Sequence, residues 1–387
     1  MVRDHDAANM SRFFDLVSKP AREMSDYLPA TPARRPPAET QPRLIKLDSN
    51  ENPFGPSPRA IEAMRAAIAI SNFYPDHDCS ELRRRLSAHH AVPTEQILVT
   101  AGSTELLSLL CQTMLAPGLN AVTSERSFIL YSMAVHASGA QLIEAPMQDD
   151  AFDLAAILNA INEDTRLVFL ANPNNPTGTI VDADSVDKFL AEVPGHVVVV
   201  LDEAYHEFAQ HFGAMRKIEY SRSLDHIRRG ASVIVLRTFS KVHGLAGLRI
   251  GYGLGPAELI AYCGRMQNTF SVASVAQAAA LAALEDQSHI TRTITSNASQ
   301  AQILGVGLSD LEFRVVPTYA NFLYCDLGED AAAIAERLRS EGVSVRPLGA
   351  WGAPTCIRVS VGTLEQNEFL LQALRKIRET ISRSELR

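Results

Sequence analysis

Short apolar runs alternate with segments of helical periodicity from Leu44 to about Pro256. Several runs are apolar at successive positions, which is typical of strands buried on both faces of a sheet. The helical segments between them predict helices on both faces, so the pattern indicates an α/β domain with a mostly parallel sheet. The seven predicted strands span residues 97–100, 121–123, 141–144, 167–171, 197–201, 233–236 and 250–254.

The pattern changes after this region. Residues 276–284 are alanine-rich and helical, and we expect a smaller α+β domain over 266–387 beside a large domain over 46–265. Its predicted strands lie near 313–316, 321–325, 343–346 and 357–361, and its predicted helices span 290–310, 331–341 and 365–381. Residues 1–45 contain an amphipathic stretch that leads into a segment with five prolines, which interrupt helices and central strands. They predict an arm that packs on the smaller domain or on a partner.

Composition and charge exclude several classes of protein. Apolar residues make up 46% and charged residues 21%, and 36 Lys and Arg against 44 Asp and Glu give a net charge of −8. This balance lacks the clustered positive charge of general nucleic-acid binders and of proteins that bind anionic membranes. No apolar run reaches the ~18 residues that a membrane span requires.

The N-terminus and the cysteines predict a cytoplasmic protein. The first residues carry mixed charge and no apolar run follows them, which argues against a secretory signal. Five cysteines lie far apart and form no Cys-x-x-Cys pair, which is typical of reduced, buried thiols. Histidines are scattered, and the cluster Asp76-His77-Asp78-Cys79 predicts a loop and no metal site.

Four polar segments follow predicted strands, where open α/β sheets bind their ligands. The first, Gly102-Ser103-Thr104-Glu105, leads into an apolar helix. The unpaired N–H groups and positive end of such a helix suit a phosphate, and an ordinary N-cap at Ser103 explains the same residues. The second segment runs from Asn172 to Gly178 and contains two prolines, which can hold an asparagine side chain rigidly at the edge of the sheet.

The other two segments carry charge at the ends of apolar strands. Asp202 follows one strand, and a buried acid is costly without a cationic partner. The protonated ring nitrogen of a cofactor would be such a partner, and a helix N-cap is the alternative. Lys241 lies among small residues, eight positions before Arg249. A lysine after a core strand can be desolvated, which lowers its pKa and permits a Schiff base.

Several motifs together carry a resemblance to a known family. Asn172 to Gly178, Asp202 to Tyr205, and Thr238 to Lys241 with Arg249 occur in the order and approximate spacing of fold-type I, pyridoxal-phosphate-dependent aminotransferases. The sequence most resembles the histidinol-phosphate aminotransferase group, through residues 47–58, 240–249 and 357–363. The resemblance extends from about Leu44 to the last helix. It implies the fold of that group, a pyridoxal phosphate cofactor and a transaminase reaction.

The resemblance implies a role for each matching residue. Lys241 resembles the lysine that binds the cofactor's aldehyde and then moves the substrate's α-proton, and Asp202 resembles the carboxylate that keeps the ring nitrogen protonated. Asn175 and Tyr205 match residues that hydrogen-bond the ring's phenolic oxygen, and Phe128 matches the aromatic residue that stacks on the ring. The residues implied in phosphate binding are Gly102, Ser103, Thr104, Thr238, Ser240 and Arg249.

The resemblance also implies a homodimer with shared active sites, because Tyr74 matches a tyrosine that reaches the phosphate in the neighbouring subunit. Arg346 and Arg358 match anion-binding positions on the substrate side, where a guanidinium suits a carboxylate or a phosphate. Asn50 and Tyr27 match further substrate-side positions. The chain departs from the family at Ala30 in place of glycine, Thr104 in place of aspartate and Arg126 in place of proline.

Together these features predict an aminotransferase that moves an amino group between glutamate or 2-oxoglutarate and a second substrate, through pyridoxamine phosphate. We expect histidinol phosphate and imidazole acetol phosphate as the second pair, with an aromatic amino acid as the alternative. A decarboxylase of phosphorylated amino acids is an alternative of another class, because the motifs around Lys241 suit both reactions. An effector-binding regulator would need a DNA-reading module, and residues 1–45 are neither basic enough nor long enough for one.

Overall fold

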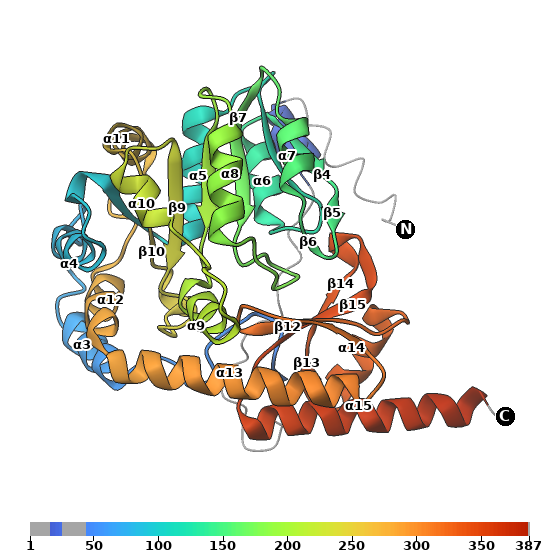
Figure 1. Cartoon of the computed structure of the whole chain (residues 1–387). Helices are drawn as coiled ribbons and strands as arrows, with labels where there is room; N and C mark the ends of the chain where they lie inside the picture. The colour runs from blue at the N-terminus through green and yellow to red at the C-terminus, as the bar shows by residue number, and fades with distance from the viewer. Residues whose placement is uncertain (1–15, 25–43, 386–387) are drawn as a thin grey trace.

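A seven-stranded sheet forms the centre of the larger part of the molecule (Figure 1). The computed structural model describes residues 16–24 and 44–385. The strand order is β2-β10-β9-β8-β7-β3-β4, and every pair is parallel except those that β10 makes with β2 and β9. The mostly parallel sheet predicted from the hydrophobic pattern is therefore confirmed. Its strands are β2 (Ile97–Thr100), β3 (Asn120–Ser124), β4 (Gln141–Ala145), β7 (Thr165–Ala171), β8 (Val198–Asp202), β9 (Val233–Thr238) and β10 (Gly251–Leu254).

Helices surround this sheet because its central strands are apolar on both faces. Every residue of β9 is buried, and β7 and β8 are buried at all but one position each. Helix α5 packs against α6 and α11, and α7 packs against α8. The helices of this part are α3 (Pro58–Ile68), α4 (Ser80–His90), α5 (Ser103–Met114), α6 (Leu130–Ala137), α7 (Leu154–Ala160), α8 (Ala183–Glu192), α9 (His206–Arg216), α10 (Ser223–Arg228), α11 (Ala257–Met266) and α12 (Ser274–Glu285).

The C-terminal part is a smaller α+β unit. Four antiparallel strands form a sheet in the order β11-β12-β15-β14, and the long helices α13 and α15 run side by side below it (Figure 1). The elements are α13 (Gln287–Ser309), β11 (Arg314–Val316), β12 (Phe322–Asp326), α14 (Ala331–Ser340), β13 (Val343–Ser344), β14 (Arg346–Leu348), β15 (Ala353–Ser360) and α15 (Leu364–Glu385).

The single strand expected over 343–346 is wrong, because the chain changes sheets within it. β13 pairs in parallel with β1 (Ile45–Lys46), whereas β14 pairs with β15. Pro347 lies in β14, which is an edge strand, and an edge is where a residue without an N–H is tolerated. A short hairpin, β5 (Met147–Gln148) and β6 (Ala151–Phe152), completes the strands that the structure describes.

The two largest hydrophobic cores reflect the two parts. The larger core surrounds the seven-stranded sheet and includes Ala276, Ala279, Ala280 and Ala283 of α12, whose small side chains pack against α3. The smaller core lies among β12, β15, α14 and α15 and includes Leu47, so the chain before α3 also belongs to the smaller part. In the described part of the arm, α2 (Lys19–Glu23) contacts α6.

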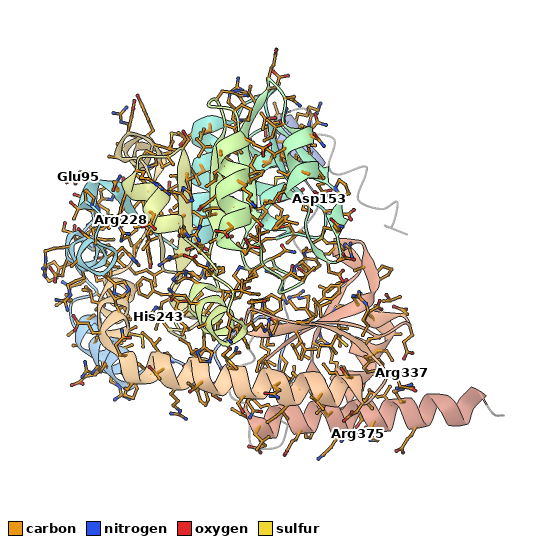
Figure 2. The ribbon with its side chains drawn as sticks, viewed as in Figure 1. Glu95, Asp153, Arg228, His243, Arg337 and Arg375 are labelled. Atoms are coloured by element: carbon orange, nitrogen blue, oxygen red, sulfur yellow. The ribbon has the colours of Figure 1, made fainter. Side chains whose placement is uncertain are left out.

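Side chains fill the space between these elements (Figure 2). Arg337 on α14 and Arg375 on α15 are exposed on the outer side of the smaller part, whereas His243 is buried among the helices where the two parts meet. All five cysteines are buried free thiols, as their spacing predicts. Within residues 16–24 and 44–385, no helix has the length and apolarity of a membrane span, and no group of side chains has the arrangement of a metal site.

Candidate active site

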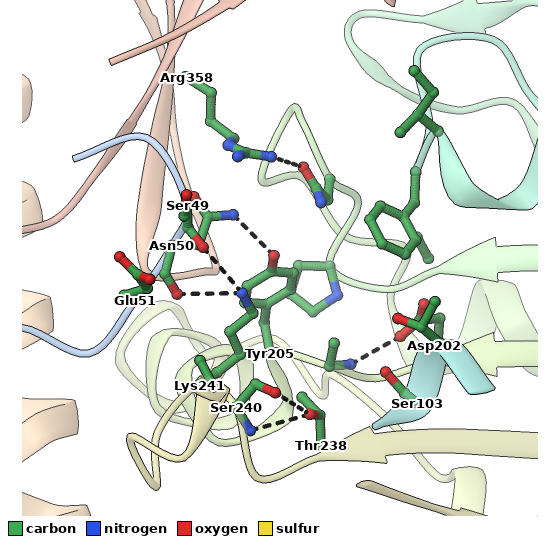
Figure 3. A pocket seen from close by; sticks show the side chains of 18 of the residues that line it. Ser49, Asn50, Glu51, Ser103, Asp202, Tyr205, Thr238, Ser240, Lys241 and Arg358 are labelled. Carbon is green, nitrogen blue, oxygen red and sulfur yellow. Dashed lines mark hydrogen bonds between the residues drawn. The ribbon is translucent and has the colours of Figure 1, made fainter. Parts of the chain in front are cut away.

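A cavity of about 300 Å³ opens where the carboxyl ends of β7, β8 and β9 face the smaller part (Figure 3). Gly102 directly precedes Ser103, which lines the cavity, and Tyr74 lies elsewhere, 82% exposed and stacked on Phe270. Tyr27 lies outside the residues that the structure describes. The other predicted site residues all line the cavity: Asn50, Ser103, Thr104, Phe128, Asn175, Asp202, Tyr205, Thr238, Ser240, Lys241, Arg249, Arg346 and Arg358.

Asp202 is buried on one side of the cavity, at the end of β8. Its carboxylate accepts hydrogen bonds from Tyr131 Oη at 2.9 Å and from the Ala204 N–H at 3.2 Å. Burial raises its pKa to about 6, although these two bonds act in the opposite direction. The following helix begins at His206 with Tyr205 as its N-cap, so Asp202 does not have the N-cap role that its sequence also suggested.

The two adjacent acids differ in their partners. Glu203 is paired with the Arg237 guanidinium at 2.7 Å, and this pairing lowers the pKa of Glu203 against the effect of burial. Within the described part of the chain, no cation lies at ion-pair distance from Asp202. Asp202 is thus the acid that a cationic ligand group in the cavity would stabilise.

Lys241 enters the cavity from the loop after β9. Its Nζ donates hydrogen bonds to the carbonyl oxygens of Ser49 and Asn50, each at 3.3 Å (Figure 3). Burial lowers its pKa to about 7, and the nearby positive charge of Arg358 acts in the same direction. A large fraction of such a lysine is a neutral amine near neutral pH, which is the nucleophilic form.

Polar side chains connect the lysine side of the cavity to the smaller part. Asn50 Nδ2 donates to Tyr205 Oη at 2.9 Å, and the Asn50 N–H donates to Ser360 Oγ at 2.7 Å. Arg358 donates to Asn175 Oδ1 (Figure 3) and to the carbonyl oxygen of Asp48. Arg358 is therefore held facing the cavity by groups from two separate segments of the chain.

Helix α5 begins directly after Gly102, which has a φ of +83°. Gly102 is the N-cap and forms no side-chain cap, so the capping by Ser103 that the sequence also permitted is not observed. A Cβ atom at Gly102 would lie 2.5 Å from Arg249 Nη2, which shows how closely the guanidinium approaches the helix end. Ser240 Oγ accepts hydrogen bonds from Thr238 Oγ1 at 2.9 Å and from Arg249 Nη1 at 3.5 Å. Backbone N–H groups, hydroxyls and a guanidinium thus meet at one point, as an anion site requires.

Comparison with known proteins assigns the family. The family model described as "aminotransferase class I and II" matches residues 42–374. This chain belongs to that aminotransferase family. It is 42% identical over 371 residues to histidinol-phosphate aminotransferase 2 of Pseudomonas aeruginosa, a match that covers 95% of this chain and 99% of the relative. It is 41% identical over 355 residues to histidinol-phosphate aminotransferase of Moorella thermoacetica, and this match covers 91% of this chain and 90% of the relative.

Similarity to a solved structure supports the same family assignment. Histidinol-phosphate aminotransferase from Sinorhizobium meliloti, in complex with pyridoxal-5′-phosphate, has 31% sequence identity and a TM-score of 0.82. The match covers 88% of this chain and 92% of that protein. The chain is accordingly a pyridoxal-phosphate-dependent aminotransferase of fold type I.

The cavity of this aminotransferase fits the cofactor at three points. The start of α5, with the cradle that a Cβ at Gly102 would fill, suits the phosphate. Lys241 supplies an amine with a lowered pKa, and Asp202 supplies a buried acid that lacks a cation within the described residues. All three groups line one cavity, so an aldehyde, a phosphate and a ring nitrogen can be bound together.

The sequence motifs missed several side chains of this site. Tyr131 lies three positions after Phe128 and its ring stacks on Phe169 at 4.8 Å, so its hydroxyl reaches Asp202 from a buried position. In the sequence, the only feature that could have indicated Tyr131 was its position close to Phe128. Ser49, Glu51 and Trp351 also line the cavity. Ser49 and Glu51 flank the predicted Asn50, whereas no motif pointed to Trp351.

Proposed function

We propose that this aminotransferase transfers an amino group between glutamate or 2-oxoglutarate and histidinol phosphate or imidazole acetol phosphate. The observation that carries the proposal is the pair Arg346 and Arg358, which lie opposite each other in the β14–β15 ladder and both line the cavity. Two guanidinium groups suit a substrate with an anionic end, and either a carboxylate or a phosphate meets that condition. The names of relatives that match nearly the whole chain favour the phosphate.

We propose the following roles for the cofactor site. When bound, pyridoxal phosphate supplies an aldehyde that combines with amines and a ring that accepts electrons from the substrate's α-carbon. Lys241 Nζ would hold the cofactor's aldehyde carbon, and once released its neutral amine would take the proton from the substrate's α-carbon and deliver it to the carbon that was the aldehyde carbon. The Asp202 carboxylate holds a proton on the ring nitrogen. Tyr205 and Asn175 orient the ring's oxygen side, and Phe128 packs against the ring face.

The remaining predicted residues have binding roles in this proposal. The N–H groups at the start of α5 hold the phosphate, and Gly102 allows the backbone to approach it. Asn50 lies beside the substrate and fixes Tyr205. Tyr27 lies outside the described residues and keeps its proposed place on the substrate side. The phosphate donors are Ser103, Thr104, Thr238, Ser240 and Arg249.

We further propose a homodimer, in which Tyr74 reaches the phosphate in the partner's site. Tyr74 and Phe270 stack at 4.7 Å with Tyr74 82% exposed, and Ile68, Ile70 and Phe73 are exposed nearby in sequence. An exposed aromatic and aliphatic surface of this kind supports an interface between subunits. Five buried free thiols support a reducing, cytoplasmic location.

For the domain division, we propose a boundary at Asp286, where α12 ends and α13 begins. This boundary lies later than the expected position near residue 266, because α12 packs in the larger core. The smaller domain then includes the chain around Leu47 as well as the C-terminal elements.

A substrate comparison tests the proposed function. Purified holoenzyme is mixed with glutamate, and the cofactor's absorption reports the first half-reaction. Imidazole acetol phosphate and phenylpyruvate are then offered separately as amino acceptors. We expect kcat/KM to be higher for imidazole acetol phosphate. A clear preference for phenylpyruvate would replace the proposed substrate with an aromatic amino acid.

A further inference from the structure

Arg126 stands where the family has proline, and its conformation is one that proline cannot adopt. It lies in the loop between β3 and α6 with a φ of +50°, whereas the ring of proline holds φ near −65°. The loop continues to Phe128, which lines the active-site cavity. The departure from the family therefore places a charged side chain two positions before a wall residue of the site.

The carboxylate of Asp150 joins Arg126 to the smaller domain. Asp150 Oδ1 accepts from Arg126 Nη1 at 3.1 Å, and Asp150 Oδ2 accepts from Arg314 Nη1 at 2.6 Å. Arg314 lies on β11 of the smaller domain, whereas Asp150 lies in the β5–β6 hairpin, whose Phe152 packs in the larger core (Figure 1). Asp150 is only 8% exposed, and hydrogen bonds between charged groups are the stronger kind. We call Arg126, Asp150 and Arg314 the interdomain clasp.

The hairpin presents this carboxylate in a fixed direction. Its two turn residues, Asp149 and Asp150, have φ values of +50° and +60°. The left-handed conformation is costly for residues other than glycine, and it persists where surrounding contacts hold it. Thr179 Oγ1 supplies one such contact, because it donates to the Asp150 carbonyl oxygen at 2.9 Å. The two ion pairs of the clasp supply the others.

On the larger domain, the clasp leads directly to the cofactor side of the cavity. The Arg126 carbonyl oxygen accepts from Asn174 Nδ2 at 3.1 Å, and Ser127 Oγ donates to Asn174 Oδ1 at 3.0 Å. The next residue, Asn175, lines the cavity and accepts from Arg358. The loop that carries Arg126 thus supports both Phe128 and the asparagine loop.

On the smaller domain, the clasp leads to the sheet that carries the substrate arginines. β11 pairs with β12, and Arg314 Nε lies 3.9 Å from Asp326 Oδ2 on that strand. β12 in turn pairs with β15, where Tyr324 lies opposite Arg358. The Tyr324 side chain also interacts with the Arg126 guanidinium. The clasp therefore joins the cofactor wall to the strands on which Arg358 is held.

We propose that Arg126, Asp150 and Arg314 are positioning residues, which fix the distance between the substrate arginines and the cofactor side of the cavity. This inference rests on the proposed function, in which a substrate contacts the cofactor and Arg358 at once. Molecules in which the two sides are correctly spaced bind substrate, and the others do not. Loss of the clasp lowers that fraction and raises the half-saturating substrate concentration in inverse proportion.

The half-reaction of holoenzyme with glutamate tests the clasp, because cofactor absorption gives the half-saturating concentration and the limiting rate separately. For Asp150→Asn and for Arg314→Gln we expect the half-saturating concentration to rise about fivefold, with the limiting rate within twofold of wild type. The double variant should lose no more than either single variant, because both remove the same contact. Arg314→Lys keeps a charge at this contact and should stay within twofold of wild type.

Asp187→Asn is the matched control. Asp187 also has a basic partner on each oxygen, His226 Nε2 and Arg222 Nη1, both at 2.7 Å, but all three residues belong to the larger domain. We expect its half-saturating concentration to equal that of the wild type. An unchanged value in Asp150→Asn and Arg314→Gln, an equal rise in Asp187→Asn, or additive losses in the double variant would overturn the clasp alone. Failure of the wild type to react with glutamate would overturn the proposed function, and the role of the clasp with it.

Discussion

The Lys241 amine makes the folding of the apoprotein depend on pH. Its pKa is about 7 in the folded chain, because burial disfavours the ammonium form, against an ordinary value of 10.5. Between these values the unfolded chain binds a proton that the folded chain does not, so the free energy of unfolding rises with pH. Lys241→Met removes this dependence. We expect the variant apoprotein to be more stable than the wild type by about 2 kcal/mol at pH 6.5, allowing for screening in a partly exposed cavity.

Urea unfolding of both apoproteins at pH 6.5 and pH 9.5 measures the effect. The stability difference should shrink as the pH rises toward 10.5, above which the wild-type amine is largely neutral in both states. The holoenzyme spectrum is a parallel check, since Lys241→Met should lose the absorption of the lysine-bound cofactor. Parallel stability curves for the two proteins would show that the amine is not desolvated.

We expect Tyr131 to be a positioning residue that acts through Asp202. Its hydroxyl hydrogen bond lowers the pKa of Asp202, which burial raises to about 6. Tyr131→Phe should therefore raise that pKa further, so the carboxylate loses its charge at a higher pH than in the wild type. We expect kcat at pH 6 to fall about tenfold and the acidic limb of the kcat profile to move to higher pH.

Tyr252→Phe is the matched control for this prediction. Tyr252 is also a buried tyrosine in a hydrogen bond, but its hydroxyl contacts His90 at 2.9 Å and not Asp202. We expect the acidic limb of this variant to stay where it is in the wild type. A similar displacement in both variants would indicate a general loss of structure and would contradict the specific role of Tyr131.

Individual site residues could be predicted from sequence only where a local pattern marked them. Asp202 ends the apolar strand β8 and Lys241 comes three positions after the end of β9, and strand ends meet at one edge of a parallel sheet. Tyr131 and Trp351 gave no comparable signal. Tyr131 lies 71 positions from Asp202, and Trp351 lies in an irregular turn, so their places depend on how separate elements pack.

Among the elements, the N-terminus of α5 depends most on one backbone position. Gly102 has a φ of +83°, and a Cβ there would lie 2.5 Å from Arg249 Nη2. Gly102→Ala should displace the guanidinium from the phosphate site and raise the Kd for pyridoxal phosphate roughly tenfold. Titration of apoprotein with the cofactor, followed by absorption, measures this change.

Gly118→Ala is the control that distinguishes the effect of backbone strain from the effect of losing the phosphate site. Gly118 has a φ of +94°, and a Cβ there would meet no atom within 4 Å. Each replacement should cost about 1 kcal/mol of stability through the left-handed backbone. Only Gly102→Ala should weaken cofactor binding. Equal affinities in the two variants would show that α5 does not hold the phosphate in the proposed way.

Elements with a regular hydrophobic pattern could be predicted from the sequence. The pairing of the strands was harder to predict. The run Val197 to Leu201 predicted β8 because apolar side chains on both faces require a buried strand. The two-residue strands β1 and β13 gave no such pattern, since a ladder of two residues has no periodicity. The antiparallel direction of β10 within the sheet also has no local sign, because a strand's pattern is the same in both directions.

At the scale of the molecule, the segment around Asn50 joins the two domains at the site. The Asn50 carbonyl oxygen accepts from Lys241 Nζ of the larger domain and from Asn321 Nδ2 of the smaller one. These partners lie 191 and 271 positions away in the chain. Sequence motifs indicated Asn50 and Lys241 but not Asn321, and the meeting of all three at one carbonyl depends on the assembled fold.

The proposed dimer leads to a prediction about mixed subunits. Lys241→Ala removes the lysine of a subunit's own site, and Tyr74→Ala removes the group proposed to serve the partner's site. Each homodimer should be nearly inactive. In a mixed dimer, one site combines the intact Lys241 of one subunit with the intact Tyr74 of the other, so random mixing should restore about a quarter of wild-type activity.

Subunits are exchanged by unfolding and refolding the two variants together, and activity is measured against the mixing ratio. Activity should be highest at equal amounts and absent from either variant refolded alone. A linear dependence on the ratio would show that Tyr74 is not required, whereas no activity at any ratio would show that Tyr74 serves its own subunit, since no mixed site would then be repaired. The exposed stack of Tyr74 on Phe270, away from the cavity of its own chain, favours exchange between subunits.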